Sequence, residues 1–347
     1  MNARVALILV VLLAVLGGAA LVFYYQDRGR QAGNVGTLGQ PVLKDLQAAE
    51  IASIRMVEPE AALTVQRKGE RWVIAERADF PADAGKVRGF VLLALSLKVG
   101  QSEPIGEKDR ARLNLGASGT QVEFAGAEGK TLAKLIVGKK YFKREVDNPD
   151  KARADGRFVA LPGELNTVYL VSDPLAQASA RSAAWIDRSS FQVEKVKTLE
   201  LRYPDGGGWR IERDGDNAEW RLAGARAGEK LDVSKANAAS YSLSLLELAD
   251  VAPPQAKQND AMTGLDKPVG IEATTLDGLV YSIKVGKLEG DNHYVSFASS
   301  GKPRKDDPQA ERRKLLSGYV LLVPKSKLDD TLQRRADLLE KADEGKK

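Results

Sequence analysis

Few side chains in this sequence could carry acid–base or nucleophilic chemistry. The sole histidine, His293, lies in the run Gly290-Asp-Asn-His-Tyr-Val-Ser-Phe297. A Ser-His-Asp site would have to use it, but no GxSxG elbow is present, and Gly116-Ala-Ser-Gly119 has only the composition of a turn. The chain has no cysteine, which excludes thiolate nucleophiles, thiolate metal sites and disulfides. We interpret His293 as a strand or turn residue and predict no catalytic residue and no enzymatic activity.

Two motifs resemble ligand-binding loops without completing them. Asp214-Gly-Asp216-Asn217 opens like a calcium loop, but Ala218 follows, and the later glycine and glutamate ligand positions are missing. Gly138-Lys139 and Gly286-Lys287 each follow an apolar run, without the GxxxxGK[ST] spacing that cradles phosphate. These patterns are typical of turns with solvated lysines. We predict no metal site and no cofactor.

Two charged stretches are the best candidates for binding a partner. Residues 139–157 hold seven basic and four acidic side chains, and residues 302–314 hold six and three. Their simplest interpretation is a pair of solvated loops; the functional one is a docking surface for a partner protein or for anionic headgroups. The predicted contact residues are Lys143, Arg144, Lys151, Arg153, Lys302, Arg304 and Lys305.

The N-terminal segment predicts a membrane anchor. Residues 5–25 contain no charge, and a helix of that length spans about 30 Å, the thickness of a bilayer core. A cleaved signal peptide is the alternative, although the apolar run exceeds the usual signal-peptide core. Residues 1–4 are then cytoplasmic, residues 26–44 form a Gly-rich linker, and the remaining chain is periplasmic. The net charge of +5 is small and mixed in sign, which argues against nucleic-acid binding.

After the linker, one order of elements occurs twice. The strand-like runs around Leu63–Arg67 and Trp209–Arg213 are each followed by a polar turn and a tryptophan, Trp72 or Trp220. Both tryptophans precede a Val-Gly-Lys motif by the same number of residues, because Gly138 lies 66 residues after Trp72 and Gly286 lies 66 after Trp220. This predicts two tandem domains, residues 45–185 and 193–330, rather than a solenoid of short repeats.

The patterns within each copy indicate an α+β fold. Short alternating strands outnumber helical segments, and short turns favour antiparallel hairpins over parallel crossovers. We expect one or two helices per copy, the main ones beginning after the N-caps Asp83 and Asp232. We also expect both tryptophans to be buried, and Gly138 and Gly286 to end their strands. An amphipathic helix is predicted from Ser326, so that residues 331–347 form a C-terminal helix and charged tail.

The same order of motifs resembles a bacterial family of unknown function, DUF4340. The resemblance rests on Gly69-Glu-Arg-Trp72-Val-Ile, Phe80-Pro-Ala-Asp83, Leu113-Asn-Leu-Gly116, Leu135-Ile-Val-Gly138 and Val168-Tyr-Leu-Val171. The second copy is more diverged and lacks the Phe-Pro-Ala-Asp words. Members of the family are similar to single-pass envelope proteins, some of them encoded beside ABC transporters of the gliding-motility type. The resemblance therefore implies an accessory role at such a transporter, and it implies no catalytic residues.

Two functions are consistent with the sequence. The first is a non-enzymatic periplasmic accessory protein, anchored in the inner membrane and associated with ABC transporter subunits. The alternative is a module that holds a small ligand or a lipid between the two repeats, where clefts often form. The sequence identifies no transported substrate and no oligomeric state.

The anchor leads to a direct test of topology. A reporter that is active only in the periplasm, fused after residue 347, should be active and should sediment with the membrane fraction, because residues 5–25 hold the chain there. A soluble mature protein beginning near Ala20 would contradict the anchor and leave only the export.

Overall fold

A computed structural model describes residues 17–18, 36–145, 148–302 and 306–341, with only the backbone described for residues 143–154. These residues form two compact units. The first contains residues 36–72 and 84–181, and the second contains residues 73–83 and 182–341. Within the described residues, no helix is long and apolar enough to cross a membrane. The anchor predicted at residues 5–25 lies outside them apart from Gly17 and Gly18.

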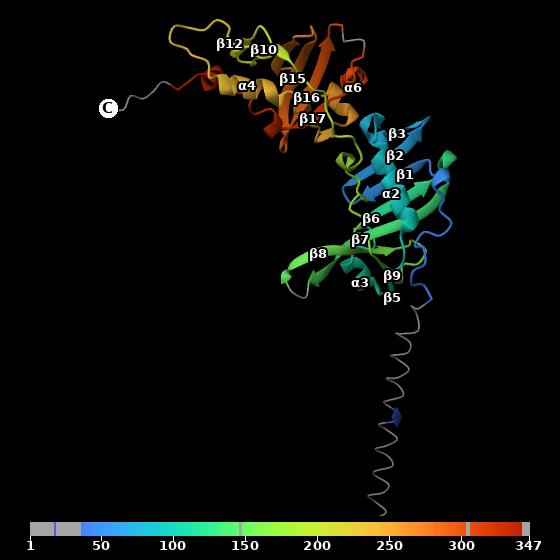
Figure 1. The fold of residues 1–347 in the computed structure, drawn as a ribbon. Helices are drawn as coiled ribbons and strands as arrows, with labels where there is room; N and C mark the ends of the chain where they lie inside the picture. Colours follow the sequence, from blue (N-terminus) through green and yellow to red (C-terminus); the bar gives the residue numbers. More distant parts are fainter. Residues whose placement is uncertain (1–16, 19–35, 146–147, 303–305, 342–347) are drawn as a thin grey trace, which may run out of the picture. The chain divides into compact units, whose positions relative to one another are not determined.

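The first sheet is antiparallel, with the order β4-β3-β2-β1-β6-β7-β8-β9-β5. Its strands are β1 (Ser53–Glu58), β2 (Ala61–Lys68), β3 (Arg71–Ile74), β4 (Phe80–Pro81), β5 (Gln101–Pro104), β6 (Thr120–Ala125), β7 (Thr131–Glu145), β8 (Asn148–Ala160) and β9 (Thr167–Val171). Helix α2 (Ala84–Ser96) lies across the sheet in Figure 1, and the short helix α3 (Glu107–Arg112) precedes β6.

The second sheet repeats this order as β12-β11-β10-β14-β15-β16-β17-β13, without a counterpart of β4. Its strands are β10 (Val196–Arg202), β11 (Gly208–Glu212), β12 (Arg221–Leu222), β13 (Asp250–Val251), β14 (Val269–Thr275), β15 (Val280–Glu289), β16 (Asn292–Ser300) and β17 (Leu321–Pro324). The helices are α4 (Val233–Ser242), α5 (Asp260–Thr263) and α6 (Ala310–Leu316). Two antiparallel sheets with few helices confirm the predicted α+β class and its two sheet domains.

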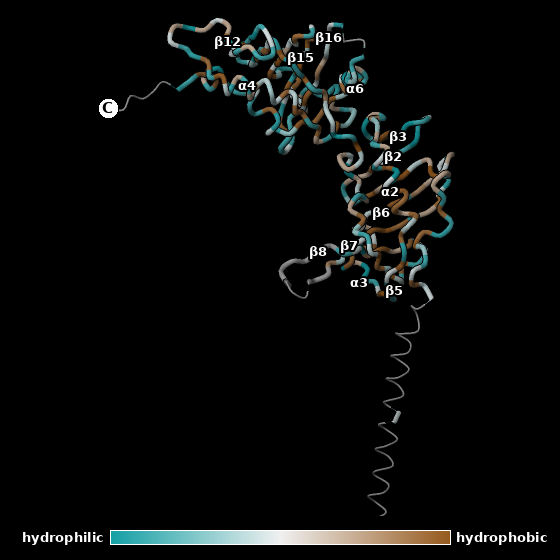
Figure 2. Tube along the Cα trace, in the orientation of Figure 1, coloured by the Kyte–Doolittle hydropathy of each residue, from teal (hydrophilic) through white to brown (hydrophobic). Residues whose placement is uncertain are grey.

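Alternating apolar residues explain why these segments pair as they do. In the first sheet Ile54 lies opposite Val65, and Met56 lies opposite Leu63; all four side chains are at most 1% exposed. The second sheet places Leu199 opposite Ile211 and Leu201 opposite Trp209 in the same way. A shift of one residue would turn every such side chain toward water, so the register follows from the pattern. Figure 2 shows the apolar residues concentrated in the strands of both units.

The two main helices correspond residue by residue at an offset of 149. The buried positions of α2 are Val87, Phe90, Val91 and Ala94, and those of α4 with its C-cap are Ala236, Ala239, Ser240 and Leu243. The predicted N-cap is confirmed at Asp232, whose carboxylate accepts bonds from the backbone of Ser234 and Lys235. Each helix therefore presents the same face to its sheet.

Gly138 and Gly286 do not end their strands, contrary to expectation. Both lie inside long strands, at a bulge between β7 and β8 or between β15 and β16. A Cβ at Gly138 would lie 2.4 Å from the carbonyl oxygen of Leu113, and one at Gly286 would lie 2.1 Å from that of Thr263. The turn after the short helix α3 or α5 approaches the strand so closely that only glycine fits.

The two repeated tryptophans differ in burial. They begin equivalent strands, Trp72 within β3 and Trp220 just before β12, but only Trp220 is buried, at 4% exposure, while Trp72 is half-buried. The indole N–H of Trp220 donates to Asn237 on α4 at 3.0 Å. The residue at that helix position in the first repeat is Arg88, which has no acceptor to offer an indole. The prediction that both tryptophans are largely buried is confirmed for Trp220, whereas Trp72 is only half-buried.

The predicted C-terminal α-helix is also wrong for the described residues. The segment after β17 contains the 3-10 turns Lys325–Lys327 and Arg335–Leu338, and residues 342–347 lie outside the described chain. Its apolar residues serve the core in an irregular path instead: Leu328 and Leu338 are at most 1% exposed. Its backbone carbonyls accept hydrogen bonds from side chains of the second unit: Tyr203, directly after β10, donates to Leu332, and Trp209 of β11 donates to Gln333.

The glycine bulge makes a prediction about stability. Gly286→Ala should lower the free energy of unfolding by about 3 kcal/mol, because the added methyl group meets backbone that must move. Gly89→Ala is the control: this helical glycine has nothing within 4 Å of the new Cβ, and the change should stabilise the protein by about 0.5–1 kcal/mol. Urea unfolding of the two variants measures both effects. Equal stability of Gly286→Ala and the parent would contradict the close approach.

Candidate functional site

The hairpin β7–β8 distinguishes the first repeat from the second. Strands β7 and β8 have 15 and 13 residues, whereas their counterparts β15 and β16 have 10 and 9. The added residues lie beyond the bulge, where the register continues from Lys140–Arg157 to Glu145–Asn148. Figure 1 shows this hairpin extending past the neighbouring strands.

Aromatic residues are exposed where the extension begins. Tyr141 is 37% exposed and Phe142 is 52% exposed, and the neighbouring Lys139 and Lys140 are exposed as well. The Tyr141 ring meets the Phe158 ring edge to face, with centroids 5.9 Å apart. Beside this pair lies a cavity of about 310 Å³, which is also lined by Val168 and Leu170 of the sheet. Large exposed aromatics beside cations are typical of contact surfaces rather than of solvated turns.

The four predicted contact residues of the first charged stretch lie on this hairpin. Lys143 and Arg144 belong to β7, and Lys151 and Arg153 belong to β8; Lys143 is paired with Arg153 in the register. The expected solvated loop is therefore a β-hairpin. No period-two apolar pattern marks its strands in the sequence, because charged residues stand at most of their positions.

Part of the second charged stretch forms contacts within the fold and is not available as a docking surface. Lys302 is exposed, but Arg304 and Lys305 lie outside the described residues. Arg313 is buried and forms an ion pair with Asp307, and Arg312 donates to the backbone carbonyls of Asp187 and Ser189. These arginines hold helix α6 and its loop in place, so their charge serves the fold.

The side chains of the motifs that resembled catalytic or metal sites are bonded to neighbouring groups of the fold. The Nδ1 atom of His293 lies 3.0 Å from the carbonyl oxygen of Gly286, across the bulge. Asp214 pairs with Arg221 at 2.7 Å, and Asp216 pairs with Arg213 at 2.9 Å. Among the residues that the structure describes, no cluster of three or more metal-ligating side chains exists.

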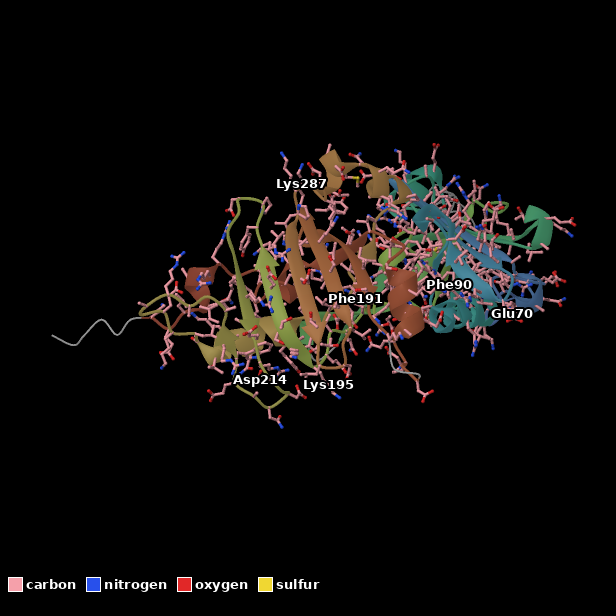
Figure 3. All side chains as sticks on the ribbon, turned by 90° about the horizontal axis from the view of Figure 1, so that it is seen from above. Glu70, Phe90, Phe191, Lys195, Asp214 and Lys287 are labelled. Atoms are coloured by element: carbon pink, nitrogen blue, oxygen red, sulfur yellow. The ribbon has the colours of Figure 1, made fainter. Side chains whose placement is uncertain are left out.

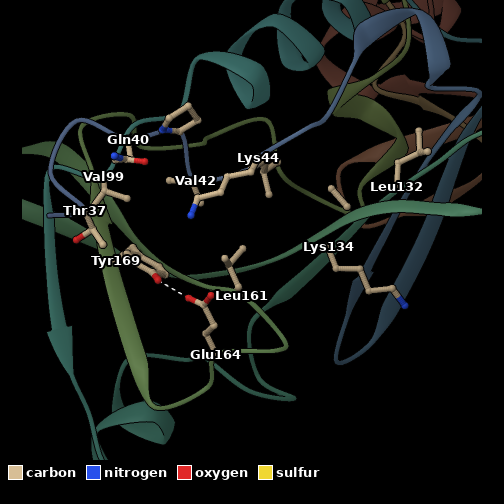
Figure 4. A pocket seen from close by; sticks show the side chains of 13 residues that line it. Thr37, Gln40, Val42, Lys44, Val99, Leu132, Lys134, Leu161, Glu164 and Tyr169 are labelled. Carbon is tan, nitrogen blue, oxygen red and sulfur yellow. Dashed lines mark hydrogen bonds between the residues drawn. The ribbon is translucent and has the colours of Figure 1, made fainter. Parts of the chain in front are cut away.

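A cavity of about 240 Å³ lies in the first unit, beside residues 37–44 (Figure 4). These residues were predicted as the end of the linker, but Val42 and Leu43 are buried and the Val42 N–H donates to the Leu97 carbonyl, so this end is part of the first unit. One wall is apolar and includes Val42, Val99 and Leu161. On the other side the Tyr169 hydroxyl donates to the Glu164 carboxylate. Figure 4 shows the Lys44 side chain reaching into the cavity. The volume is below the usual 300–1,000 Å³ of ligand pockets, so the cavity would accept only a small group.

Burial and the Glu164 carboxylate together raise the pKa of Tyr169 to about 12. Burial contributes most, because it disfavours the phenolate; the hydrogen bond to Glu164 and repulsion by its charge act in the same direction.

Comparison with known proteins identifies the family. The model of the family described as "Domain of unknown function (DUF4340)" matches residues 72–268, more than half of the chain. The chain belongs to the DUF4340 family. The match begins at β3 of the first sheet and ends just before β14 of the second, so it covers parts of both repeats. No curated protein and no solved structure matches the chain.

The raised pKa of Tyr169 makes a prediction for alkaline pH. An unfolded tyrosine loses its proton near pH 10, whereas native Tyr169 keeps it to about pH 12. The native state therefore binds more protons in this window, and its stability must fall as the pH rises from about 10 to about 12. Tyr169→Phe should lose this part of the pH dependence. Urea midpoints of both proteins at pH 8, 9.5 and 11 measure the difference, and parallel curves would contradict the assignment.

Proposed function

We propose that this DUF4340 protein is a non-enzymatic accessory protein of the cell envelope, whose first repeat binds a membrane partner through the β7–β8 hairpin. The observation that best supports this proposal is the extension of that hairpin, with Tyr141 and Phe142 exposed at its base. The second repeat has the same sheet order without this extension. A feature added to one of two sheets that share the same order of central strands is not required by that order.

The chemistry of the hairpin fits a protein partner. Aromatic residues bury a large area at low entropic cost, and they dominate the energetics of many interfaces. The lysines beside them attract an acidic partner and accelerate association more than they strengthen the final complex. A two-stranded hairpin outside a sheet is marginally stable alone. A partner that covers Tyr141 and Phe142 would therefore also stabilise the extension.

Anchoring would make a weak interface sufficient. If residues 5–25 span the inner membrane, the linker confines both repeats close to the bilayer. Confinement raises the effective concentration for any partner in the same membrane. An ABC-type transport complex is our proposed partner; support for it comes from the family resemblance alone, which is an analogy and not a physical argument.

The hairpin proposal is tested by removing its aromatic side chains. Tyr141→Ala combined with Phe142→Ala should lower recovery of the partner from native membranes, in mild detergent, by about ten-fold or more, which is the loss expected for an interface hot spot. Leu288→Ala is the matched control, because Leu288 is 48% exposed on the shorter hairpin of the second repeat. Both proteins should fold, since the changed side chains are exposed.

Charge reversal tests the electrostatic part separately. Replacing Lys143, Arg144, Lys151 and Arg153 together with glutamate should reduce recovery most at low salt, where steering is strongest. Undiminished recovery of both variants would remove the hairpin from the interface. Recovery of a partner that is not a transporter component would keep the hairpin and reject the transporter.

A further inference from the structure

The second unit contains a cavity of about 650 Å³, within the usual size range of ligand sites. It lies beside helix α4, the start of β10 and the turn between β11 and β12. Its lining residues are Val193, Glu194, Lys195, Val196, Arg213, Asp216, Trp220, Asn237, Ala238, Ser240, Tyr241 and Ser244. We call this cavity the α4 groove.

Two aromatic residues, Trp220 and Tyr241, line the α4 groove. Trp220 is buried and held in place from two sides: its N–H donates to Asn237, and the guanidinium of Arg213 lies 4.7 Å from its ring centroid. Tyr241 is 63% exposed, on the helix face that lines the groove. A tyrosine this exposed contributes little to the core, so its ring face is available to a ligand.

The polar groups of the groove are fixed in position and balanced in charge. Arg213 donates to the carbonyl oxygens of Val196 and Asp216 and to the Asp216 carboxylate. Arg213 and Lys195 are matched by Asp216 and Glu194, so an ionic ligand gains no net attraction. The amide nitrogen of Asn237 and the hydroxyl of Tyr241 have no hydrogen-bond partner among the described residues. These groups suit a neutral ligand with many hydroxyls.

The backbone at the rim of the groove is strained. Lys195, labelled in Figure 3, has a φ of +49°, a left-handed conformation that side-chain-bearing residues rarely adopt. Its carbonyl accepts a bond from the Leu276 N–H at 2.8 Å, and β10 carries a bulge directly after it, between Val196 and Thr198. Strain of this kind is concentrated at functional sites, where the surrounding structure maintains it.

The first repeat does not reproduce these features. At the offset of 149 that aligns the buried faces of α2 and α4, Leu92 corresponds to Tyr241 and Arg88 corresponds to Asn237. Leucine has no π face, and arginine adds a charge and cannot accept a hydrogen bond. The combination of an exposed tyrosine with a buried tryptophan bonded to an asparagine therefore belongs to the second repeat.

We propose that the α4 groove binds a neutral saccharide, with one pyranose ring stacked on Tyr241. The negative face of the tyrosine ring attracts the C–H groups of the apolar face of a sugar. Asn237, Ser244 and the remaining N–H groups of Arg213 are the partners for its hydroxyls, and their fixed geometry supplies specificity. The proposal is independent of the hairpin and of any partner that binds there.

The test uses the full chain in mild detergent and calorimetric titration with maltotetraose, cellotetraose and chitotetraose. At least one should bind, and Tyr241→Ala should weaken its affinity about ten-fold or more, as expected for loss of a stacking contact. Tyr241→Phe should retain most of the affinity, because the ring remains. Leu92→Ala, at the equivalent exposed position of the first repeat, should bind like the parent.

Because Tyr241 is exposed, its substitution should leave the unfolding midpoint unchanged, which separates lost binding from lost folding. Absence of binding by all three oligosaccharides at millimolar concentration would overturn the proposal. Undiminished binding by Tyr241→Ala would also overturn it, since the sugar would then occupy another place.

Discussion

The close approach of backbone to backbone at Gly138 and Gly286 determines how each sheet is assembled. In both repeats the C-terminal end of a short helix lies against a bulged glycine, with a carbonyl oxygen within 2.4 Å of the position that a Cβ would take. This contact joins the segment before β6 or β14 to the central hairpin, and it fixes where that hairpin bends. In the first repeat the Lys139 N–H donates to the same Leu113 carbonyl at 2.9 Å. The extended hairpin begins immediately after this bond, so its direction is set by the bulge.

The two repeats keep this backbone constraint while their cores differ. Phe90 and Phe124 stack at 6.0 Å between α2 and the first sheet. Their counterparts in the second repeat are Ala239 and Ala273, both fully buried, so both partners of the pair are small there. Bulk is supplied elsewhere: Trp209 occupies the position of Leu63, and Phe191 stacks on Phe297 at 3.8 Å. A core tolerates such exchanges when the total volume is retained.

The two proposed functions rest on differences between the surfaces of the two repeats. The first repeat adds length to a hairpin and exposes aromatics there, which suits a large partner surface. The second repeat shortens the hairpin and instead combines Trp220, Asn237 and Tyr241 beside a groove of ligand size. The change at the helix is small. Arg88 of the first repeat corresponds to Asn237 of the second, and Leu92 corresponds to Tyr241. Trp220 occupies only the oxygen of the Asn237 amide, so the amide nitrogen remains a donor that faces the groove.

The sequence by itself determined the double order of elements, the α+β class and the buried face of many strands. These follow from local patterns, because alternation with period two selects the buried face of each strand and a polar turn marks its end. The Asp232 cap was readable for the same reason, since its partners lie two and three residues away. The tertiary structure decided the rest. Gly138 appeared to end a strand because its steric constraint comes from Leu113, which lies 25 residues earlier. The irregular C-terminal segment, with helix-like spacing, bonds to residues more than 100 positions away, as Trp209 does to Gln333. The hairpin carries no apolar alternation because charged residues stand at most of its positions, and the α4 groove joins side chains from separate elements. Such features depend on contacts between distant parts of the chain, which local periodicity does not encode.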